Sequence, residues 1–187
     1  MAVKNAGGIV IVQVKKCVRS GSLDPKLVKI PSLLVDYVVE VEDETKHMQT
    51  FNTQFNSDFI QSNVIKSENS QAVPLNDRKI IARRSAQLIP ADAKIVNFGI
   101  GVPEVISAVL KEEGSSDRFT TTIEPGSFGG VPVGGLDFGA AISPESIIDQ
   151  SYMFDFYDGG GIDIAFLGLA ECDKDGNINV SKFGPKI

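Results

Sequence analysis

The segment KIVNFGIGVPEVISAVLKEEGSSDRFTTTIEPG, residues 94–126, decides the fold. Its start predicts a short strand that runs into a glycine turn at residues 99–101. Pro103 suits the first turn of a helix, and Gly114 is placed to end that helix. Residues 118–126 are rich in Thr and Ile, which predicts a second strand that ends at a glutamate. An order of strand, helix and strand is typical of parallel strands joined by a crossover helix.

The same alternation continues on both sides of this segment. Asn76 or Asp77 is placed to cap a helix through RKIIARRSAQLI, which Pro90 ends. Residues 144–150 predict one or two helical turns, and DIAFLGLAECD, residues 163–173, predicts a further buried strand. We therefore predict an α/β fold with a mostly parallel sheet and flanking helices.

Two apolar stretches come before these elements. GGIVIVQVKKCV, residues 7–18, is rich in Val and Ile and predicts a strand buried on both faces. LLVDYVVEVE, residues 33–42, predicts a second strand that ends in acidic residues. Residues 63–73 are mostly polar and are predicted to be a linker between residues 1–62 and 74–187. A strand opens the chain and another lies near its end, so we expect incomplete domains.

The composition limits the classes of function. The chain has 187 residues, 42% of them hydrophobic, and a net charge of −6, which is typical of a globular protein with an acidic surface. Such a surface disfavours nucleic-acid partners, and no apolar run approaches the roughly 20 residues of a membrane span. The isolated Cys17 and Cys172 fit a reducing compartment. The single histidine, His47, excludes a multi-histidine metal site.

Glu124 is the first candidate for chemistry. It ends a predicted strand and precedes glycines, at the edge where open α/β sheets usually bind ligands. From position alone it could equally be a solvated glutamate at a strand end. The turn at residues 99–101 opens a helix, so its backbone N–H groups could bind a carboxylate or a developing oxyanion. It lacks the third glycine of a dinucleotide motif, and a plain tight turn is the alternative.

Three further segments have a structural interpretation, and two of them also have a functional one. GGVPVGG, residues 129–135, either lets the backbone approach a ligand or forms a surface loop. FDFYDGGG, residues 154–161, is either a wall against a ligand or another domain, or a group of core aromatics beside a turn. DKDGN, residues 173–177, is typical of a tight turn. Taken singly, none of these segments identifies a function.

The order of the motifs is distinctive. GIGVPE is followed by IEPG with GGVPVGGLDFG, then by FDFYDGGGID and GNINVSKFG. In this order they resemble the second half of family I coenzyme A (CoA) transferases. NAGGIVIVQV, VDYVVEV and KHMQTF resemble the end of the first half in the fused acetate/propionate type. The resemblance implies that residues 1–62 are the C-terminal remnant of the first, alpha-like half. Residues 74–187 would be the N-terminal part of the second, beta-like half, which carries the catalytic glutamate.

The resemblance also implies residue roles. Glu124 would attack the acyl-CoA carbonyl. The implied substrate- and CoA-binding residues are Asn97, Gly99, Ile100, Gly101, Gly129, Gly130, Asn177 and Asn179. The choice between the last two stays open. Pro125 departs from the family pattern, in which serine is commoner after the glutamate, and affects the backbone beside the nucleophile.

The implied reaction moves CoA between short-chain acyl groups, as in ketone body metabolism, through a mixed anhydride and then a glutamyl–CoA thioester. Acyl-CoA, acetate, propionate and acetoacetate are the expected partners, with CoA as substrate and no bound cofactor or metal. The family pattern extends beyond both ends, so we expect the chain to need the remaining segments or self-association and to be inactive alone. The cytoplasm, or a mitochondrial matrix, is the expected location.

Two other functions remain open from the sequence. The chain could be a catalytically inactive remnant or binding module. It could also be a different enzyme on a similar fold, such as a sugar-phosphate isomerase. Such a site should carry basic residues for phosphate, and the glycine loops have none nearby.

Overall fold

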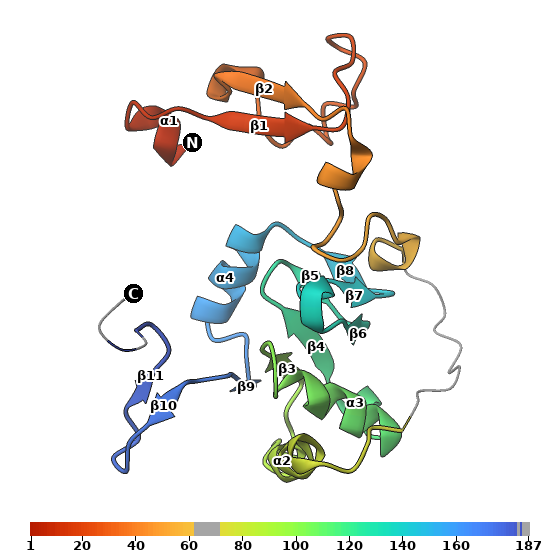
Figure 1. Ribbon diagram of the computed structural model, residues 1–187, viewed down its shortest axis with the longest axis vertical. Coiled ribbons are helices and arrows are strands. Elements are labelled where there is room, and N and C mark those ends of the chain that lie inside the picture. Colours follow the sequence, from red (N-terminus) through yellow and green to blue (C-terminus); the bar gives the residue numbers. More distant parts are fainter. Residues whose placement is uncertain (62–71, 183, 185–187) are drawn as a thin grey trace. The chain divides into compact units, whose positions relative to one another are not determined.

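The computed structural model describes residues 1–61, 72–182 and 184, and it divides into two compact units (Figure 1). The first unit is Met1–Phe55 and the second is Asn56–Ile187. This division comes before the predicted one at residue 62. The second unit begins at Asn56 because the Ser143 N–H donates to the Asp58 carbonyl over 2.7 Å and links the segment around Asp58 to that unit. Most of the predicted linker lies outside the described residues.

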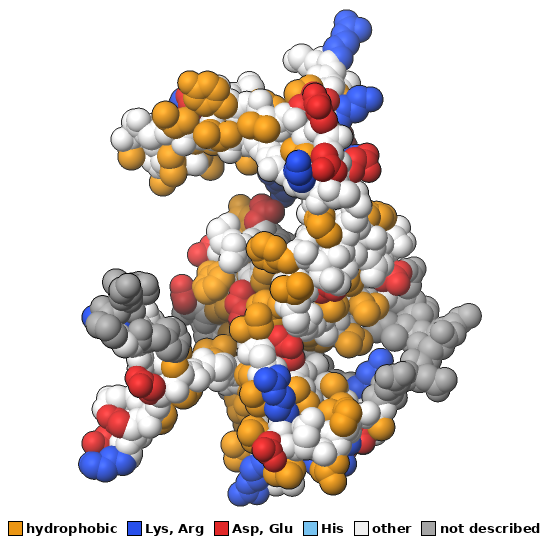
Figure 2. Space-filling view, in the orientation of Figure 1, with side chains coloured by type: hydrophobic (Ala, Val, Ile, Leu, Met, Phe, Trp, Pro, Cys, Tyr) orange, Lys and Arg blue, Asp and Glu red, His pale blue; other side chains and the backbone are white. Residues whose placement is uncertain are grey.

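The first unit is built around a pair of parallel strands, β1 (Ile11–Val14) and β2 (Tyr37–Glu40). Within this unit the two strands have no further strand partner among the described residues. The prediction of a strand buried on both faces is therefore wrong for β1, because no layer of this unit covers its side chains and Ile11 stays 64% exposed. Figure 2 shows apolar side chains gathered on the surface of this unit. Its helical turns are α1 (Ala2–Asn5), η1 (Ser32–Leu34) and η2 (Glu44–Lys46).

The second unit contains a sheet with the strand order β8-β5-β4-β3-β9. The pairs β3–β4 and β3–β9 are parallel, whereas β5 pairs antiparallel with both β4 and β8. The predicted α/β fold is confirmed, and the sheet is mixed rather than uniformly parallel because the chain turns back at Gly126 instead of crossing over. The five strands are β3 (Ile95–Phe98), β4 (Thr120–Ile123), β5 (Ser127–Phe128), β8 (Ser146–Ile147) and β9 (Ile164–Phe166).

Smaller elements complete this unit. The glycine-rich segment after β5 forms a second antiparallel pair, β6 with β7, and the end of the chain forms a hairpin, β10 with β11. Their bounds are β6 (Val131–Pro132), β7 (Ala141–Ile142), β10 (Glu171–Cys172) and β11 (Ile178–Asn179). Single helical turns are η3 (Ser57–Phe59), η4 (Ser116–Arg118) and η5 (Gly135–Asp137).

Helices α2 (Asp77–Ala86) and α3 (Glu104–Glu112) form the core with one face of the sheet. The predicted cap of α2 is confirmed, since the Asn76 side chain accepts the Lys79 N–H. Val96 and Phe98 of β3 point into this core, with the Phe98 ring stacked on Phe166 at 5.8 Å. Because side chains alternate along a strand, the residue between them faces the other side of the sheet.

The third long helix, α4, spans Gln150–Asp158. The prediction of helical turns over residues 144–150 is wrong for most of that range, because Ser146 and Ile147 pair with β5 as strand β8. Helix α4 begins where this pairing ends and carries the aromatic residues that the sequence places before the triple glycine.

Candidate active site

Glu124 follows the last residue of β4 and is half-buried. Its Oε2 atom is buried, and no described residue gives it a hydrogen-bond partner. The turn behind it is tight, since the Gly126 N–H donates to the Ile123 carbonyl over 2.9 Å at a φ of +130°. An added Cβ at Gly126 would overlap the Ile148 carbonyl oxygen. The chain therefore reverses immediately after Glu124 and leaves its side chain at the end of the sheet.

Glu124 lines a pocket of about 610 Å³ at this end of the sheet. The wall is mainly apolar and comes from the turn after β3, the segment after β9 and the β10–β11 hairpin. The described residues that line it include no lysine or arginine. They are Gly99, Ile100, Glu124, Phe138, Leu167, Gly168, Leu169, Ala170, Ile178 and Val180. A carboxylate on an apolar wall suits a nucleophile that must be kept from bulk water.

The glycine turn after β3 is the second feature of the pocket. Gly99 lies close to the backbone of Phe166 and Leu167, and the Gly99 N–H donates to the Phe166 carbonyl oxygen. A Cβ added at Gly99 would lie 3.1 Å from the same oxygen. The Gly101 N–H donates to Glu104 Oε1 over 2.7 Å. The glutamate of the following helix accepts the Gly101 N–H in this structure, and the anion-binding role of this turn stays a prediction. No described residue accepts the Ile100 N–H.

Asn97 lies on the opposite face of β3 from the core and is only 2% exposed. Its amide donates to the Thr122 carbonyl over 3.1 Å and to the Tyr157 hydroxyl oxygen over 3.4 Å. Asn97 does not line the pocket of Glu124. Its side chain is hydrogen-bonded within the protein, and the substrate contact of Asn97 stays a prediction.

Tyr157 belongs to the aromatic segment of residues 154–161, and the sequence interpretation assigned it no individual role. Its side chain reaches the sheet from α4, and its pKa is raised by burial and by the nearby charge of Glu124. The Thr122 hydroxyl and the Asn97 amide act in the opposite direction on the same pKa. The available signal was the spacing of Met153, Phe156 and Tyr157, which places three large side chains on one helical face.

The two asparagines near the end of the chain do not reach the pocket. The Asn177 amide donates to Asp173 Oδ2 over 2.7 Å and closes the β10–β11 turn. The Asn179 amide donates to Glu171 Oε2 and to the Lys182 carbonyl. Ile178 and Val180 line the pocket instead, because alternate residues of a strand face opposite sides. The polar contact from Asn177 or Asn179 stays a prediction that this pocket lining does not itself support.

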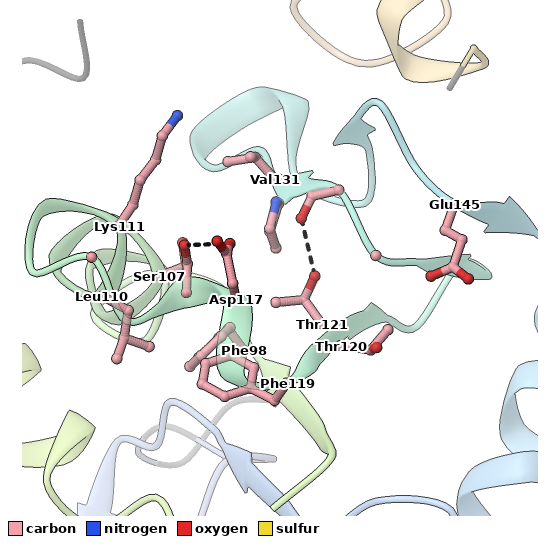
Figure 3. A pocket seen from close by; sticks show the side chains of 15 residues that line it. Phe98, Ser107, Leu110, Lys111, Asp117, Phe119, Thr120, Thr121, Val131 and Glu145 are labelled. Carbon is pink, nitrogen blue, oxygen red and sulfur yellow. Dashed lines mark hydrogen bonds between the residues drawn. The ribbon is translucent and has the colours of Figure 1, made fainter. Parts of the chain in front are cut away.

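Gly129 and Gly130 line a different pocket, of about 530 Å³, between α3 and the β5–β6 turn. Figure 3 shows Phe98 and Phe119 on one side of it and Glu145 on another, with Thr121 bonded to the Gly130 carbonyl over 3.2 Å. An added Cβ at Gly130 would lie 2.5 Å from the Ile142 oxygen, so this glycine is needed for the turn. The structure does not bring the pair together with Glu124.

The described residues contain no group of three His, Cys, Asp or Glu side chains placed to hold a metal ion. Nor does the described part of the chain include a helix long and apolar enough to cross a membrane.

Comparison with known proteins identifies what the chain is similar to. It is 45% identical over 183 residues to a caffeate CoA-transferase of Acetobacterium woodii, a match that covers 97% of the chain. It is 41% identical over all 187 residues to the acetate CoA-transferase YdiF of Escherichia coli K12. The chain is homologous to part of the CoA-transferases. It spans 34% of the length of both relatives.

Solved structures of a CoA-transferase show the same fold. The chain aligns over its full length with an acyl-CoA transferase of E. coli O157:H7, YdiF, in a thioester complex with CoA, at a TM-score of 0.75 and 35% identity. The apoenzyme of the same protein aligns at 0.74 and 36%. The chain matches 33% of each of these structures. No protein-family model matches it. The predicted resemblance to CoA-transferases is confirmed.

Proposed function

We propose that this chain is the glutamate-bearing part of an acyl-CoA:carboxylate CoA-transferase, with Glu124 as the acyl acceptor. One observation carries the proposal. Glu124 is half-buried on the apolar wall of a pocket at the carboxyl end of β4, beside the glycine turn after β3. The homology to CoA-transferases supports the same reaction class. The substrates are acyl-CoA and a short-chain carboxylate such as acetate, propionate or acetoacetate.

The reaction divides into two displacements and their reversal. A Glu124 oxygen attacks the acyl carbonyl, the C–S bond breaks, and CoA leaves as a thiolate, so that a mixed anhydride between Glu124 and the acyl group remains. The thiolate then attacks the Glu124 carbonyl and expels the acyl group as a carboxylate, which leaves CoA on Glu124 as a thioester. The acceptor carboxylate repeats these steps in reverse order.

The pocket offers what each displacement requires. A carboxylate is a weak nucleophile, so the oxyanion that forms on the attacked carbonyl needs hydrogen-bond donors. The Ile100 N–H, on the pocket wall, is the candidate donor, and one such donor contributes about 3 kcal/mol to transition-state stabilisation. Apolar side chains around Glu124 exclude water from both intermediates, which would otherwise hydrolyse.

The rest of the CoA site is assigned to segments that the relatives contain and this chain does not match. Complete activity therefore requires those segments, supplied in cis or by association, and the cytoplasm is the compartment we assign. The alternative is an inactive remnant or binding module, which would bind CoA without forming a thioester. A sugar-phosphate isomerase is disfavoured, because the described wall of the pocket contains no lysine or arginine for a phosphate.

A chimaera tests the proposal. The matching third of the E. coli acetate CoA-transferase is replaced by this chain, and CoA exchange between propionyl-CoA and labelled acetate is followed. Glu124→Gln should abolish exchange and the CoA adduct on the peptide that contains residue 124. Glu145→Gln makes the same chemical change in the other pocket and should leave both intact. Exchange that survives Glu124→Gln eliminates this nucleophile.

A further inference from the structure

The inference concerns Glu104 at the start of α3, and it rests on the proposed function of Glu124. The Glu104 carboxylate is shared between two glycine loops. Its Oε1 atom accepts the Gly101 N–H over 2.7 Å, and its Oε2 atom accepts the Gly135 N–H over 3.3 Å. Gly101 belongs to the turn after β3, whereas Gly135 begins η5. One half-buried side chain therefore joins two segments that are distant in the sequence, and we call this arrangement the Glu104 bridge.

Only one of the two bonds has a purely structural explanation. A Glu or Gln near the start of a helix commonly accepts an N–H group from the residue three positions before it, which stabilises the helix start. Gly101 and Glu104 have this spacing. The bond to Gly135 is not part of such a cap, because η5 lies outside α3. An added Cβ at Gly134 would overlap the Glu104 carboxylate, so this side chain lies directly against the η5 loop, residues 134–139.

The bond to Gly101 leaves one donor of the turn for the pocket. The Gly99 N–H donates to a carbonyl of β9 over 2.8 Å, and the Gly101 N–H donates to Glu104. Between these two groups, the Ile100 N–H has no acceptor in the described part of the chain, and Ile100 lines the pocket of Glu124. Internal bonds on both sides thus fix the orientation of the peptide group that we assign to the oxyanion.

The bond to Gly135 supports a wall of the same pocket. The Phe138 N–H donates to the Gly135 carbonyl over 3.2 Å, and Phe138 lines the pocket of the proposed nucleophile. Phe138 also lines a neighbouring pocket of about 420 Å³, so packing alone does not hold it. An added Cβ at Gly139 would lie 3.1 Å from Pro125, the residue after the nucleophile. The η5 loop therefore extends from the Glu104 carboxylate to the nucleophile turn.

We propose that Glu104 is a positioning residue, which holds the Ile100 N–H and the Phe138 wall in place around Glu124. It acts through the two loops and does not touch the reacting atoms. With the Glu104 bridge formed, the oxyanion donor is preorganised for the attacked carbonyl. The Phe138 wall, held by the same side chain, excludes water from the anhydride and the thioester.

Glu104→Gln separates the two bonds in the 187-residue chain. A glutamine keeps one acceptor oxygen, which can still cap the helix through Gly101, but its NH₂ group cannot accept a second N–H. In NMR spectra of protein with isotope-labelled glycine, the Gly135 amide proton should lose its hydrogen-bonded shift. Glu113→Gln, which changes an acceptor of the Arg83 side chain at the other end of α3, should leave both amides unchanged. If Gly101 and Gly135 both keep their shifts in Glu104→Gln, the Glu104 bridge is overturned.

Gly134→Ala tests the same contact without changing Glu104, and it covers the case in which Glu104→Gln fails to fold. Gly134 has a φ of −103° and a ψ of −175°, an extended backbone that alanine adopts without strain. The added Cβ would displace the Glu104 carboxylate, so the Gly135 amide should again lose its shift. In a Glu104→Ala background the same change should add no further loss, because no carboxylate is left to displace. An unchanged Gly135 shift in Gly134→Ala overturns the contact.

Kinetics in the chimaera test the positioning role. Glu104→Ala removes both bonds and should lower kcat about 10- to 100-fold with little change in the KM for acyl-CoA, since a misplacement of about 1 Å has an effect of this size. Glu104→Gln, which keeps one bond, should recover part of the loss. The ratio of acyl-CoA hydrolysis to transfer should rise in Glu104→Ala and Gly134→Ala, a change that reduced stability alone does not produce.

The same assay separates this inference from the proposed function. If Glu124→Gln abolishes exchange but Glu104→Ala and Gly134→Ala keep the original kcat and hydrolysis ratio, Glu104 has no positioning role and the function stands. If exchange survives Glu124→Gln, the function is wrong and the positioning role is overturned with it, whereas the glycine amide shifts still decide whether the Glu104 bridge exists.

Discussion

Replacement of Gly126 by alanine should destabilise the second unit. The loss should exceed that of the same change at a positive-φ glycine where an added Cβ would meet no neighbouring atom. Gly126 has a φ of +130°, a conformation that costs an alanine roughly 1–3 kcal/mol. The new Cβ would also overlap the Ile148 carbonyl oxygen. Relief requires the two backbones to separate, which breaks the bond of 2.9 Å from the Ile148 N–H to the Gly126 carbonyl, worth about 0.5–1.5 kcal/mol. Together these two contributions give a loss of about 1.5–4.5 kcal/mol.

Gly114→Ala is the matched control. Gly114 also has a positive φ, +66°, but an added Cβ there has no atom within 4 Å, so only the backbone cost of about 1–2 kcal/mol applies. Both free energies of unfolding are measured by urea denaturation with far-ultraviolet circular dichroism, since the chain has no tryptophan. Equal losses in the two variants would refute the close approach at Gly126. A Gly126→Ala protein that folds should also show a displaced Glu124 and reduced CoA exchange in the chimaera.

Two further outcomes are expected. Ile106→Ala removes a side chain that is 2% exposed and should cost about 2–5 kcal/mol in urea denaturation, whereas Leu88→Ala, at a 62% exposed site, should stay within about 0.5 kcal/mol; similar losses would contradict the assigned core. The pKa of Asp163 is lowered by the N–H groups of Ile95 and Lys94, so its contribution to stability is present above its unfolded pKa and is lost as pH falls through the folded pKa. Asp163→Asn should therefore make the acid limb of a stability-against-pH curve below about pH 4 shallower, and an equally steep limb would exclude this contribution.

The elements that the sequence predicts well are those whose signals are local. Asn76 before a helical stretch and Gly114 after one bound α2 and α3, and the structure has both helices there. The β-branched run before Glu124 forms β4. Each of these signals depends on the conformational preference of a few neighbouring residues, so no distant contact can reverse it easily.

The hydrogen-bond partners of the candidate polar groups are harder to predict from the sequence. The Gly101 N–H is taken by the side chain of Glu104, and the amides of Asn177 and Asn179 are taken by acidic side chains of their own hairpin. Tyr157 gains its place only because α4 packs against the sheet. Even between neighbours such as Gly101 and Glu104, which donor finds which acceptor depends on the local turn geometry, and residue types alone do not determine it.

The exposed parallel pair of β1 and β2 has a calorimetric consequence. Two strands without a covering layer bury little apolar surface, and a pair of this size is at best marginally stable in water. On heating, the chain should therefore absorb heat in a cooperative unfolding transition of the second unit only. Divided by 187 residues, that enthalpy should fall below the ~0.7 kcal/mol per residue typical of globular proteins near 60 °C.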